Sequence, residues 1–351
     1  MNSTPSATAS GFFRRPQLLT AALLATFALA ACAATPARST LADRPEVRGF
    51  IDEMVAQYEF EPKTLIDVFR QVRYRQDVID AISRPAERKP WYQYRPQFIT
   101  ENRITGGVDF WNANREALER AQQTFGVPPE IITAIIGVET YYGRQTGRYR
   151  VLDSLATLAF DYPPRGEFFR GELREFLLLT REEKLDPLRV TGSYAGAMGV
   201  PQFIASSYRN YGIDFAGDGH RNLLTNMTDA IGSIANYLKQ HDWESGGPVA
   251  SPATVDGQDY EALLDAGLKP HSSVADFAAK GVHVAAADLP ADRIAALVRL
   301  DSGENSQEYW LAFNNFYVIT RYNRSPLYAM AVYQLAEEIR KREQQARTVS
   351  R

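Results

Sequence analysis

One apolar segment organises the fold of this chain: Ile131-Ile132-Thr133-Ala134-Ile135-Ile136-Gly137-Val138-Glu139-Thr140-Tyr141-Tyr142-Gly143. Two prolines precede it, and proline is tolerated in the first turn of a helix. The spacing i, i+3, i+4 and i+7 predicts that one helical face is formed by Ile132, Ile135, Ile136 and Glu139. The segment therefore predicts a buried helix with a carboxyl at the end of its apolar face.

The position of Glu139 on an apolar face has two interpretations. Glutamate is almost never fully buried without a partner, and a carboxyl that loses hydration has a raised pKa. A glutamic acid that is protonated near neutral pH has the property that a general acid requires. The same pattern equally fits a glutamate that is paired with arginine or held by backbone N–H groups.

Composition limits the class of protein. The 351 residues are 45% hydrophobic and 23% charged, which is typical of a globular protein with two or three domains. A formal net charge of −3 without a concentrated basic surface predicts no nucleic-acid partner. A single cysteine excludes an intrachain disulfide, and four scattered histidines argue against a zinc site.

The first residues have the features of a signal peptide, predicted over residues 1–31. A basic pair, Arg14-Arg15, precedes an apolar run over residues 18–31 that is too short to span a membrane. The run ends in Leu29-Ala30-Ala31-Cys32, which resembles a bacterial lipobox. We therefore expect lipidation of Cys32; the alternative is ordinary cleavage that leaves a free cysteine.

Residues 32–42, rich in Ser, Thr, Pro and Ala, are predicted to form a tether behind this anchor. More than one hydrocarbon chain on Cys32 gives stable attachment to a membrane. Ala33 stands where an aspartate is expected for inner-membrane retention, so we expect a periplasmic protein anchored to the outer membrane.

Helical periodicity predicts a mainly α fold with a smaller α+β part. Residues 43–126 are predicted to form a helical region, in which residues 108–125 form one helix closed by Gly126. Residues 127–246 form the core that carries Glu139. Short helix and strand signals predict a small inserted α+β subdomain over residues 247–314. Residues 315–345 complete the core and include a last helix.

A second informative stretch is Gly192-Ser193-Tyr194-Ala195-Gly196-Ala197-Met198-Gly199-Val200-Pro201-Gln202-Phe203. Its many small residues let the backbone approach another backbone or a ligand closely. In one interpretation Ser193 and Gln202 project hydrogen-bonding groups into a groove. In the other, the small residues serve tight packing without a ligand.

Together these two stretches resemble the membrane-bound lytic murein transglycosylase B family. The resemblance is carried by the segment from Gly137 to Gly143, by the Gly-Ser-Tyr-Ala-Gly-Ala-Met-Gly-x-x-Gln-Phe run, and by Asn315-Phe316-Tyr317-Val318-Ile319-Thr320-Arg321-Tyr322-Asn323-Arg324-Ser325. The three blocks stand in the family's order and at about its spacing. The resemblance extends over residues 43–335.

The resemblance implies a lysozyme-like helical core, over residues 127–246, that cleaves the β-1,4 bond between N-acetylmuramic acid and N-acetylglucosamine in peptidoglycan. Glu139 matches the family's single catalytic acid/base. Polar groups that line the family's groove are matched by Ser193 and Gln202. Residues that contact the sugars around the cleaved bond are matched by Tyr322, Asn323 and Tyr328. The implied partners are glycan strands and the outer membrane, and we expect a monomer.

The chemistry of a single glutamate is unusual, because glycoside hydrolases normally use two carboxylates. The three blocks contain no second acidic residue. One glutamate suffices if the muramic acid C6 hydroxyl attacks C1, which gives a 1,6-anhydro product without water or a catalytic cofactor. The alternatives are a water-using muramidase with Asp153 or Asp161 as the second carboxylate, a non-catalytic peptidoglycan-binding lipoprotein, and a calcium-dependent scaffold.

Residues 214–229 resemble an EF-hand loop. Asp214, Asp218 and Gly219 occupy positions one, five and six, whereas Ala216 at position three has no ligand atom. The family's longer loop closes with an aspartate, which Asp229 matches. The expected ligands of a structural Ca²⁺ are therefore Asp214, Asp218, the carbonyl of His220 and Asp229. The alternative is an Asp/Gly turn that caps the helix over residues 230–238.

Overall fold

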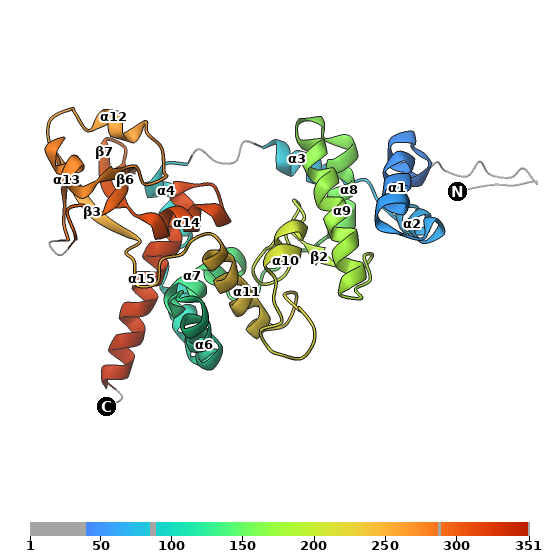
Figure 1. The fold of residues 1–351 in the computed structure, drawn as a ribbon, viewed down its shortest axis with the longest axis horizontal. Coiled ribbons are helices and arrows are strands. Elements are labelled where there is room, and N and C mark those ends of the chain that lie inside the picture. The colour runs from blue at the N-terminus through green and yellow to red at the C-terminus, as the bar shows by residue number, and fades with distance from the viewer. Residues whose placement is uncertain (1–39, 85–88, 287–288, 350–351) are drawn as a thin grey trace, which may run out of the picture. The chain divides into compact units, whose positions relative to one another are not determined.

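The computed structural model describes residues 40–84, 89–286 and 289–349 (Figure 1). The predicted signal peptide, Cys32 and tether residues up to 39 lie outside these ranges. The tether was expected to include Ala42, but Ala42 is buried in the 3-10 helix η1, Leu41–Asp43. The carboxylate of Asp43 accepts hydrogen bonds from the N–H and hydroxyl of Thr40, which starts the fold two residues earlier than expected.

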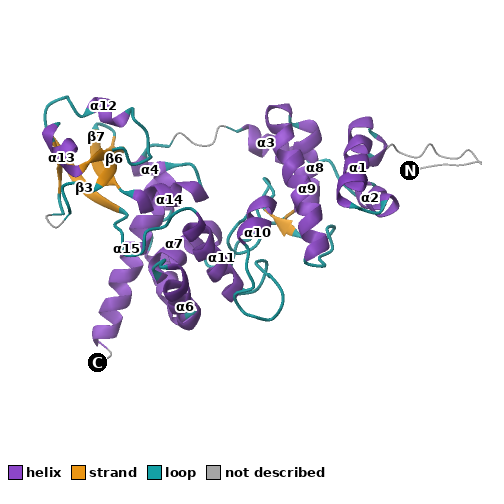
Figure 2. Cartoon of the chain, viewed as in Figure 1, coloured by secondary structure: helices purple, strands orange, loops and turns teal. Residues whose placement is uncertain are grey.

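Helices make up most of the described residues, as predicted (Figure 2). The α-helices are α1 (Pro45–Tyr58), α2 (Pro62–Phe69), α3 (Gln76–Ser83), α4 (Trp91–Tyr94), α5 (Glu101–Ala113), α6 (Arg115–Phe125), α7 (Pro129–Thr140), α8 (Val151–Asp161), α9 (Gly166–Glu182), α10 (Ala205–Tyr211), α11 (Met227–Gln240), α12 (Glu261–Leu264), α13 (Val274–Ala279), α14 (Asn314–Tyr322) and α15 (Pro326–Val349). Further 3-10 turns are η2 (Arg95–Gln97) and η3 (Pro163–Arg165).

The strands of the described residues form one two-stranded pair and one larger sheet. They are β1 (Tyr149–Arg150), β2 (Thr191–Gly192), β3 (Ala250–Val255), β4 (Ser272–Ser273), β5 (Val282–Val284), β6 (Ile294–Gly303) and β7 (Ser306–Ala312). The larger sheet has the order β4-β6-β7-β3-β5, and all its pairs are antiparallel. It lies in the predicted α+β subdomain, close to α12 and α13 (Figure 2).

One predicted helix is divided in the structure. The single helix expected over residues 108–125 is split between α5 and α6, because Asn114 leaves the helical conformation (φ −119°, ψ 23°). Its side-chain amide donates to the carbonyl of Phe110, which satisfies the end of α5. Gly126 closes α6 in a left-handed conformation (φ 74°), as expected for a C-terminal glycine.

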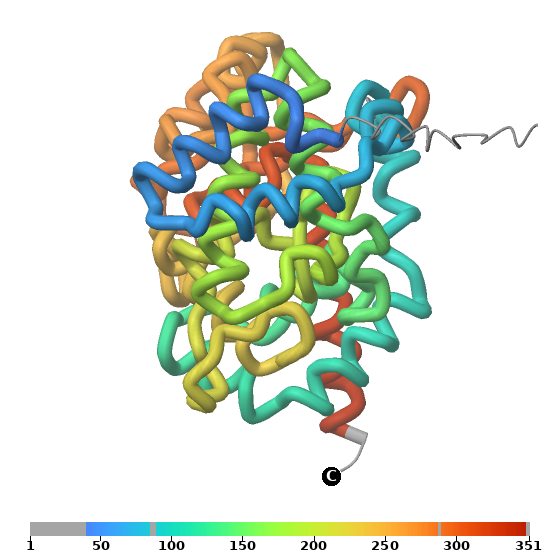
Figure 3. The backbone as a smooth tube through the Cα atoms, turned by 90° about the vertical axis from the view of Figure 1, so that its right-hand side faces the viewer, coloured from blue at the N-terminus to red at the C-terminus, as the bar shows by residue number. Residues whose placement is uncertain are grey.

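Helix α7 lies in the core, and its residues from Ile131 to Gly137 are all buried. It packs against α15, α5, α6 and α11. Figure 3 shows the C-terminal helix in red beside the cyan and teal segments that carry α5 and α6. The apolar segment that carries Glu139 thus becomes a buried helix with four other helices packed on it.

The larger sheet is buried on both faces, which explains the apolar run along β6. Val298 and Leu300 belong to the main hydrophobic core, whereas Ala295 and Leu297 pack with Phe277 in a second core. The main core lies on one side of the sheet, while α12 and α13 supply the other side. A strand that is covered on both sides does not need to alternate apolar and polar residues.

A short β pair brings two of the quoted sequence blocks together. Tyr149 of β1 pairs with Gly192 of β2, so the chain that leaves the end of α7 meets the start of the second block. Gly147, in a left-handed conformation (φ 101°), lies against the backbone of Gly192, where a Cβ atom has no room. The glycines of this region therefore serve close backbone contact.

Candidate active site

Glu139 lies in the last turn of α7, where the helix leaves the core. Ile132, Ile135 and Ile136 of the predicted apolar face are completely buried, whereas Glu139 is half-buried. Because α7 ends at Thr140, the carboxyl is carried on a rigid helix but lies at its end. The predicted placement of a carboxyl at the end of the apolar face is confirmed.

The turn that follows α7 is tightly fixed. Tyr141 and Tyr142 both adopt left-handed conformations (φ 50° and 63°), which are costly for residues other than glycine. The hydroxyl of Thr140 donates to the carbonyl of Val200 (3.0 Å) and accepts from the N–H of Gly143 (3.0 Å). These bonds tie the end of α7 to the second sequence block.

Gly137 makes room for an aromatic ring. A Cβ atom at this position would lie 2.8 Å from atoms of the Tyr142 ring. The ring is held from its other end, because its hydroxyl donates to the carbonyl of Arg103 (2.6 Å). The glycine two residues before Glu139 therefore serves packing behind the site.

The carboxyl of Glu139 has one hydrogen-bond partner among the described residues. The hydroxyl of Tyr328, on α15, donates to Oε1 of Glu139 over 2.6 Å. Burial raises the pKa of Glu139 from 4.5 to about 7, although the hydrogen bond from Tyr328 lowers it. The partial negative charge at the C-terminal end of α7 acts in the same direction as burial. The sequence allowed either a carboxyl with a raised pKa or one paired with arginine or backbone N–H groups. In the structure, Glu139 has the raised pKa.

Tyr328 and Tyr322 form a stacked pair beside the carboxyl. Their ring centroids are 6.4 Å apart and their planes differ by 10°. The hydroxyl of Tyr322 donates to the carbonyl of Pro201 (2.5 Å), and burial raises the pKa of both tyrosines well above 10. Both hydroxyls therefore remain protonated donors throughout the neutral pH range.

A cavity of about 600 Å³ adjoins Tyr322. Of the residues that the family resemblance assigned to the groove or to sugar contact, Gln202, Tyr322 and Asn323 lie in its wall, and the buried Tyr328 does not. The complete lining is Arg165, Phe168, Phe169, Ala195, Gln202, Phe203, Ile204, Ser207, Tyr237, Arg321, Tyr322, Asn323 and Arg324. The third sequence block thus meets the second block at this cavity.

Gln202 is held in place by its amide group. Its Nε2 donates to the carbonyls of Thr146 (3.0 Å) and Gly199 (2.9 Å), and its backbone is left-handed (φ 50°). Both N–H bonds of the amide are therefore used to fix the loop. Its Oε1 atom is the part of the side chain left to accept a hydrogen bond from a ligand.

Ser193 has a local role in the described structure. Its hydroxyl oxygen accepts from the N–H of Ala197 (3.0 Å), which closes a turn that begins with Gly192. The side chain does not belong to the lining of the 600 Å³ cavity, although Ala195 in the same turn does. The glycines of this run lie against backbone or core atoms, such as Gly199 against Leu223, so they serve close packing.

Asp153 and Asp161, proposed from the sequence as a second carboxylate, are engaged elsewhere. Asp153 is buried, pairs with Arg150 (2.5 Å) and accepts from the backbone N–H of Arg73 (2.9 Å). Asp161 pairs with Arg44 over 2.9 Å. Both carboxylates therefore link α8 to neighbouring segments instead of facing the cavity.

The loop over residues 214–229 is closed by hydrogen bonds from its own backbone. Asp214 accepts from the N–H groups of Gly217, Asp218 and Gly219, which lowers its pKa. The fully buried Asp229 accepts from the N–H groups of the residues at 216 and 222, and Asp218 accepts from that of His220. Within the described residues, no group of three or more His, Cys, Asp or Glu side chains is arranged to hold a metal ion. The oxygens that a Ca²⁺ ion would need are thus engaged by backbone N–H groups, and Ala216 supplies no side-chain ligand.

The arginines and the exposed aromatic ring of the cavity were missed by sequence reasoning. Arg321 and Arg324 flank Tyr322 and Asn323 in the third block, so their positions were a usable signal. Arg165 gave none, because it follows a Pro-Pro break between helices. The Phe168 side chain is 42% exposed at the same cavity, which is unusual for so large an apolar group.

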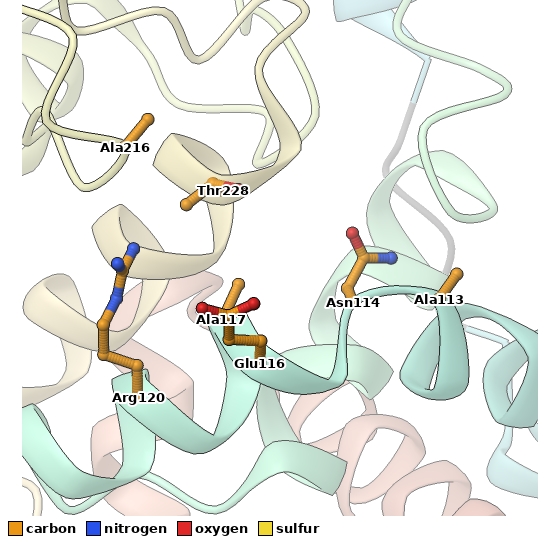
Figure 4. A pocket seen from close by; sticks show the side chains of 7 residues that line it. All are labelled: Ala113, Asn114, Glu116, Ala117, Arg120, Ala216 and Thr228. Carbon is orange, nitrogen blue, oxygen red and sulfur yellow. The ribbon is translucent and has the colours of Figure 1, made fainter.

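A second cavity, of about 330 Å³, lies between α6 and α11. Figure 4 shows Glu116 and Arg120 of α6, with Thr228 of α11 and Ala216 of the preceding loop around it. None of its lining residues belongs to the predicted groove. The 600 Å³ cavity, which adjoins Tyr322, is therefore the better candidate for substrate.

Within the described ranges, no helix combines the length and the apolar character that a membrane span requires.

Comparison with known proteins identifies the family. A family model described as "Transglycosylase SLT domain" matches residues 42–337. The chain is 46% identical over 308 residues to membrane-bound lytic murein transglycosylase B of Escherichia coli strain K12, a match that covers 85% of this chain and 83% of the relative. The resemblance inferred from the three sequence blocks is confirmed.

Solved structures of lytic transglycosylases are similar to this chain in sequence and in fold. The soluble lytic transglycosylase SltB1 of Pseudomonas aeruginosa is 54% identical with a TM-score of 0.80, over 85% of this chain and 99% of that one. Escherichia coli Slt35 in complex with calcium is 43% identical with a TM-score of 0.77, over 86% and 94%. Pseudomonas aeruginosa SltB3 in complex with NAG-anhNAM-pentapeptide is 29% identical with a TM-score of 0.75, over 84% and 79%.

The mainly α, lysozyme-like fold is confirmed by these matches. The chain belongs to the transglycosylase SLT domain family and is a lytic transglycosylase.

Proposed function

We propose that the protein cleaves the β-1,4 bond between N-acetylmuramic acid and N-acetylglucosamine in peptidoglycan and forms 1,6-anhydromuramic acid, with Glu139 as the only acid/base. The observation that carries the proposal is the pKa of about 7 at Glu139. This carboxyl does not itself line the 600 Å³ cavity, but it interacts electrostatically with Tyr322, which does, and the lining contains no Asp or Glu. A carboxyl with this pKa is substantially protonated near neutral pH and is also a competent base once it has lost its proton.

In the first step, protonated Glu139 donates its proton to the glycosidic oxygen, and the bond from that oxygen to C1 of muramic acid breaks. The 2-acetamido oxygen of the same sugar assists at C1. In the second step the C6 hydroxyl oxygen bonds to C1 as the acetamido oxygen leaves it, and the hydroxyl proton passes to the Glu139 carboxylate. The glutamate ends as it began, and no water is consumed.

Tyr328 has a defined part in this cycle. Because its hydroxyl donates to Oε1, the exchangeable proton of Glu139 resides on Oε2. The same bond fixes the orientation of the carboxyl and stabilises the carboxylate that exists between the two steps. Because the hydrogen bond from Tyr328 stabilises the ionised form of Glu139, it lowers the pKa of this carboxyl.

The alternative of a water-using muramidase requires a second carboxylate in the groove. Among the described residues, the two candidates from the sequence, both on α8, are engaged in ion pairs. The buried Glu172 accepts from both the N–H and the hydroxyl of Ser206. This arrangement favours attack by the substrate's own C6 hydroxyl.

Relatives support the substrate. The Escherichia coli relative is described as acting on murein, and SltB3 has been solved with a fragment that contains anhydromuramic acid. The Tyr322 ring and the polar atoms of Gln202 and Asn323 line the cavity and suit a sugar ring there, whereas the buried Tyr328 acts through Glu139. Ser193 supports this groove by shaping its loop.

Mass spectrometry of the soluble products from purified sacculi tests the proposal. The parent protein is expected to release anhydromuropeptides, and Glu139→Gln to release none. Products with reducing ends would establish water as the acceptor. If sacculi bind the parent without any product, the protein is a non-catalytic binding lipoprotein.

For localisation, we propose lipidation at Cys32 and anchoring to the outer membrane, supported by the lipobox-like sequence and by the membrane-bound relative. The Cys32→Ser variant is expected to move from the membrane fraction to the soluble periplasmic fraction. Retention of this variant in washed outer membranes would contradict lipidation as the anchor.

For the loop over residues 214–229, we propose a structural role to which Ca²⁺ adds weakly. Escherichia coli Slt35, to which this chain is similar, has been solved in complex with calcium, and this supports an ion in this chain. In this chain the ion must compete with backbone N–H groups for the oxygens of Asp214 and Asp229, and Ala216 supplies no side-chain ligand. The loop is therefore expected to remain closed without the ion.

A further inference from the structure

The end of the helix that carries Glu139 has an unusual backbone conformation. Helix α7 is followed by Tyr141 and Tyr142, both left-handed (φ 50° and 63°). Helices normally place glycine at such a position, because an L side chain is strained in this conformation. The strain persists only where the surrounding structure enforces the conformation. Two consecutive tyrosines in this conformation therefore require contacts that hold them.

Arg103, in the first turn of α5, contacts both tyrosines. Its guanidinium lies over the ring of Tyr141, 4.9 Å from the centroid, and its carbonyl accepts from the hydroxyl of Tyr142 (2.6 Å). The same guanidinium lies over the ring of Phe98, which precedes α5, at 5.4 Å. One residue thus holds both of the strained residues that follow α7, the first through its side chain and the second through its backbone.

The charge of Arg103 is not matched by a carboxylate. Among the residues that the structure describes, this half-buried arginine forms no ion pair with an acidic side chain, and its buried Nε atom has no hydrogen-bond partner. Burial lowers the pKa of Arg103, and a cation in the first turn of a helix is also disfavoured by the helix dipole. A cation over an aromatic face is stabilised most where water is excluded. The rings of Phe98 and Tyr141 are therefore the partners of this charge.

The turn after α7 determines the direction of the Glu139 carboxyl. The N–H of Tyr142 donates to the carbonyl of Ile136 (3.2 Å), and this bond closes the helix end in its left-handed termination. Glu139 lies in the same last turn, and its Oε1 accepts from the hydroxyl of Tyr328 on α15 (2.6 Å). A hydrogen bond is sensitive to the displacement of its donor or acceptor. Relaxation of the turn would therefore move Glu139 relative to Tyr328.

We propose, on the basis of the function proposed above, that Arg103 is a positioning residue for the reaction: its guanidinium holds Tyr141 in the left-handed conformation, which fixes the last turn of α7 and with it the orientation of the Glu139 carboxyl. Arg103 acts through this turn and not through its charge, because burial and the hydrogen bond from Tyr328 account for the pKa of Glu139. A small displacement of a catalytic group lowers the rate of the chemical step more than it lowers the affinity for substrate.

The test is Arg103→Met, made both in the parent and in Tyr141→Gly. Methionine keeps an unbranched apolar side chain but removes the charge, and glycine adopts the left-handed conformation without strain. Initial rates of muropeptide release from purified sacculi are measured with the full chain in detergent, over a range of substrate concentrations that separates kcat from the apparent KM. Urea unfolding establishes that each variant is folded under the conditions of the assay.

In the parent, Arg103→Met should lower kcat about tenfold and change the apparent KM by less than about twofold. Arg103→Lys should restore much of kcat, because an ammonium group also lies favourably over an aromatic ring. In the Tyr141→Gly background, Arg103→Met should lower kcat by less than about twofold, because a glycine at this position needs nothing to hold it.

A matched control is Arg181→Met. The guanidinium of Arg181, in the last turn of α9, lies 4.2 Å from the centroid of the Phe60 ring, and the residue does not line the 600 Å³ cavity. This variant loses the same kind of interaction and should keep both kcat and the apparent KM of the parent. An equal fall in kcat in the control would overturn the proposal, because the loss would then be general.

Three other results would overturn the proposal. An unchanged kcat in Arg103→Met is the first. The same fall in kcat in both backgrounds is the second, since Arg103 would then act independently of Tyr141. A rise in the apparent KM without a fall in kcat is the third, and it would assign Arg103 to substrate binding. If Arg103→Met does not fold, Arg103→Gln, which keeps a planar polar group without the charge, takes its place in the same comparison.

A failure of the proposed reaction is seen separately. The reaction is judged by the products of the parent and of Glu139→Gln, whereas the role of Arg103 is judged by comparing the two backgrounds. Activity that survives in Glu139→Gln would remove the proposed reaction and the positioning role with it, even if Arg103 and Tyr141 are coupled. Anhydromuropeptides from the parent and none from Glu139→Gln, together with equal effects of Arg103→Met in both backgrounds, would keep the reaction and remove only the positioning role.

Discussion

Glu139→Gln should stabilise the folded protein at alkaline pH. Burial raises the pKa of Glu139 from 4.5 to about 7, so between these values the folded state holds a proton that the unfolded state has released. Stability therefore falls as the pH rises through this interval. One pKa unit corresponds to about 1.4 kcal/mol, which gives about 3 kcal/mol above pH 7, and partial exposure of the side chain reduces this to about 2 kcal/mol.

Glutamine has nearly the same shape as protonated glutamic acid, and its carbonyl oxygen accepts from Tyr328 in the same way. The two proteins should therefore unfold alike near about pH 4.5 and diverge above it. The assay is urea unfolding of the parent and the variant at several pH values, with the difference in unfolding free energy plotted against pH. All other titrating groups are shared, so the difference reports Glu139 alone.

A matched control is Glu304→Gln, which removes the same charge from an exposed position between β6 and β7. The difference in unfolding free energy between this control and the parent should not rise between about pH 4.5 and about pH 7. A flat difference for Glu139→Gln, or a parent that is the more stable protein at alkaline pH, would refute the argument that burial keeps this carboxyl protonated.

Three further predictions concern the surroundings of this glutamate. In Tyr328→Phe, the pH at which activity declines on the alkaline side should rise by up to about one unit, because the Tyr328 hydroxyl lowers the pKa of Glu139. A downward shift of this pH in the pH–rate profile would contradict the prediction. Gly137→Ala should lower the free energy of unfolding by about 1–3 kcal/mol, since its Cβ would lie 2.8 Å from the Tyr142 ring. The control Gly49→Ala, which has open space around it in α1, should be neutral or stabilising; urea unfolding measures both. Ca²⁺ at about 10 mM should stabilise the loop over residues 214–229 by about 1–3 kcal/mol relative to Mg²⁺ in thermal scans, and micromolar affinity would contradict the weak site.

Much of the candidate site was predictable because its signals are local. The spacing of Ile132, Ile135 and Ile136 placed Glu139 on an apolar face, and the structure has that helix with that carboxyl at its end. The third block contained Tyr322 and Asn323, which line the cavity. The apolar face could be predicted from the sequence because the helical repeat fixes which side chains share a face.

Other parts of the site were not predictable from patterns. Ser193 was expected in the groove but closes its own turn through Ala197, because a serine hydroxyl readily bonds to nearby backbone N–H groups. The carboxylates of Asp214 and Asp229 were expected to meet a metal ion, and in the described residues they meet backbone N–H groups. Local hydrogen bonds compete with ligand binding for the same atoms, and the sequence does not rank them.

The sequence by itself determined the helical class, the apolar helix with its terminal carboxyl, and the family. Each follows from spacing between neighbouring residues or from the order of the blocks. The tertiary structure decided the protonation of Glu139, because its partner Tyr328 is 189 residues away and the apolar surroundings come from several helices. It also decided that Arg165 joins Arg321 and Arg324 at one cavity. Charge and burial act through space, so the groups that set a pKa or bind an anion are known only when the chain has brought them together.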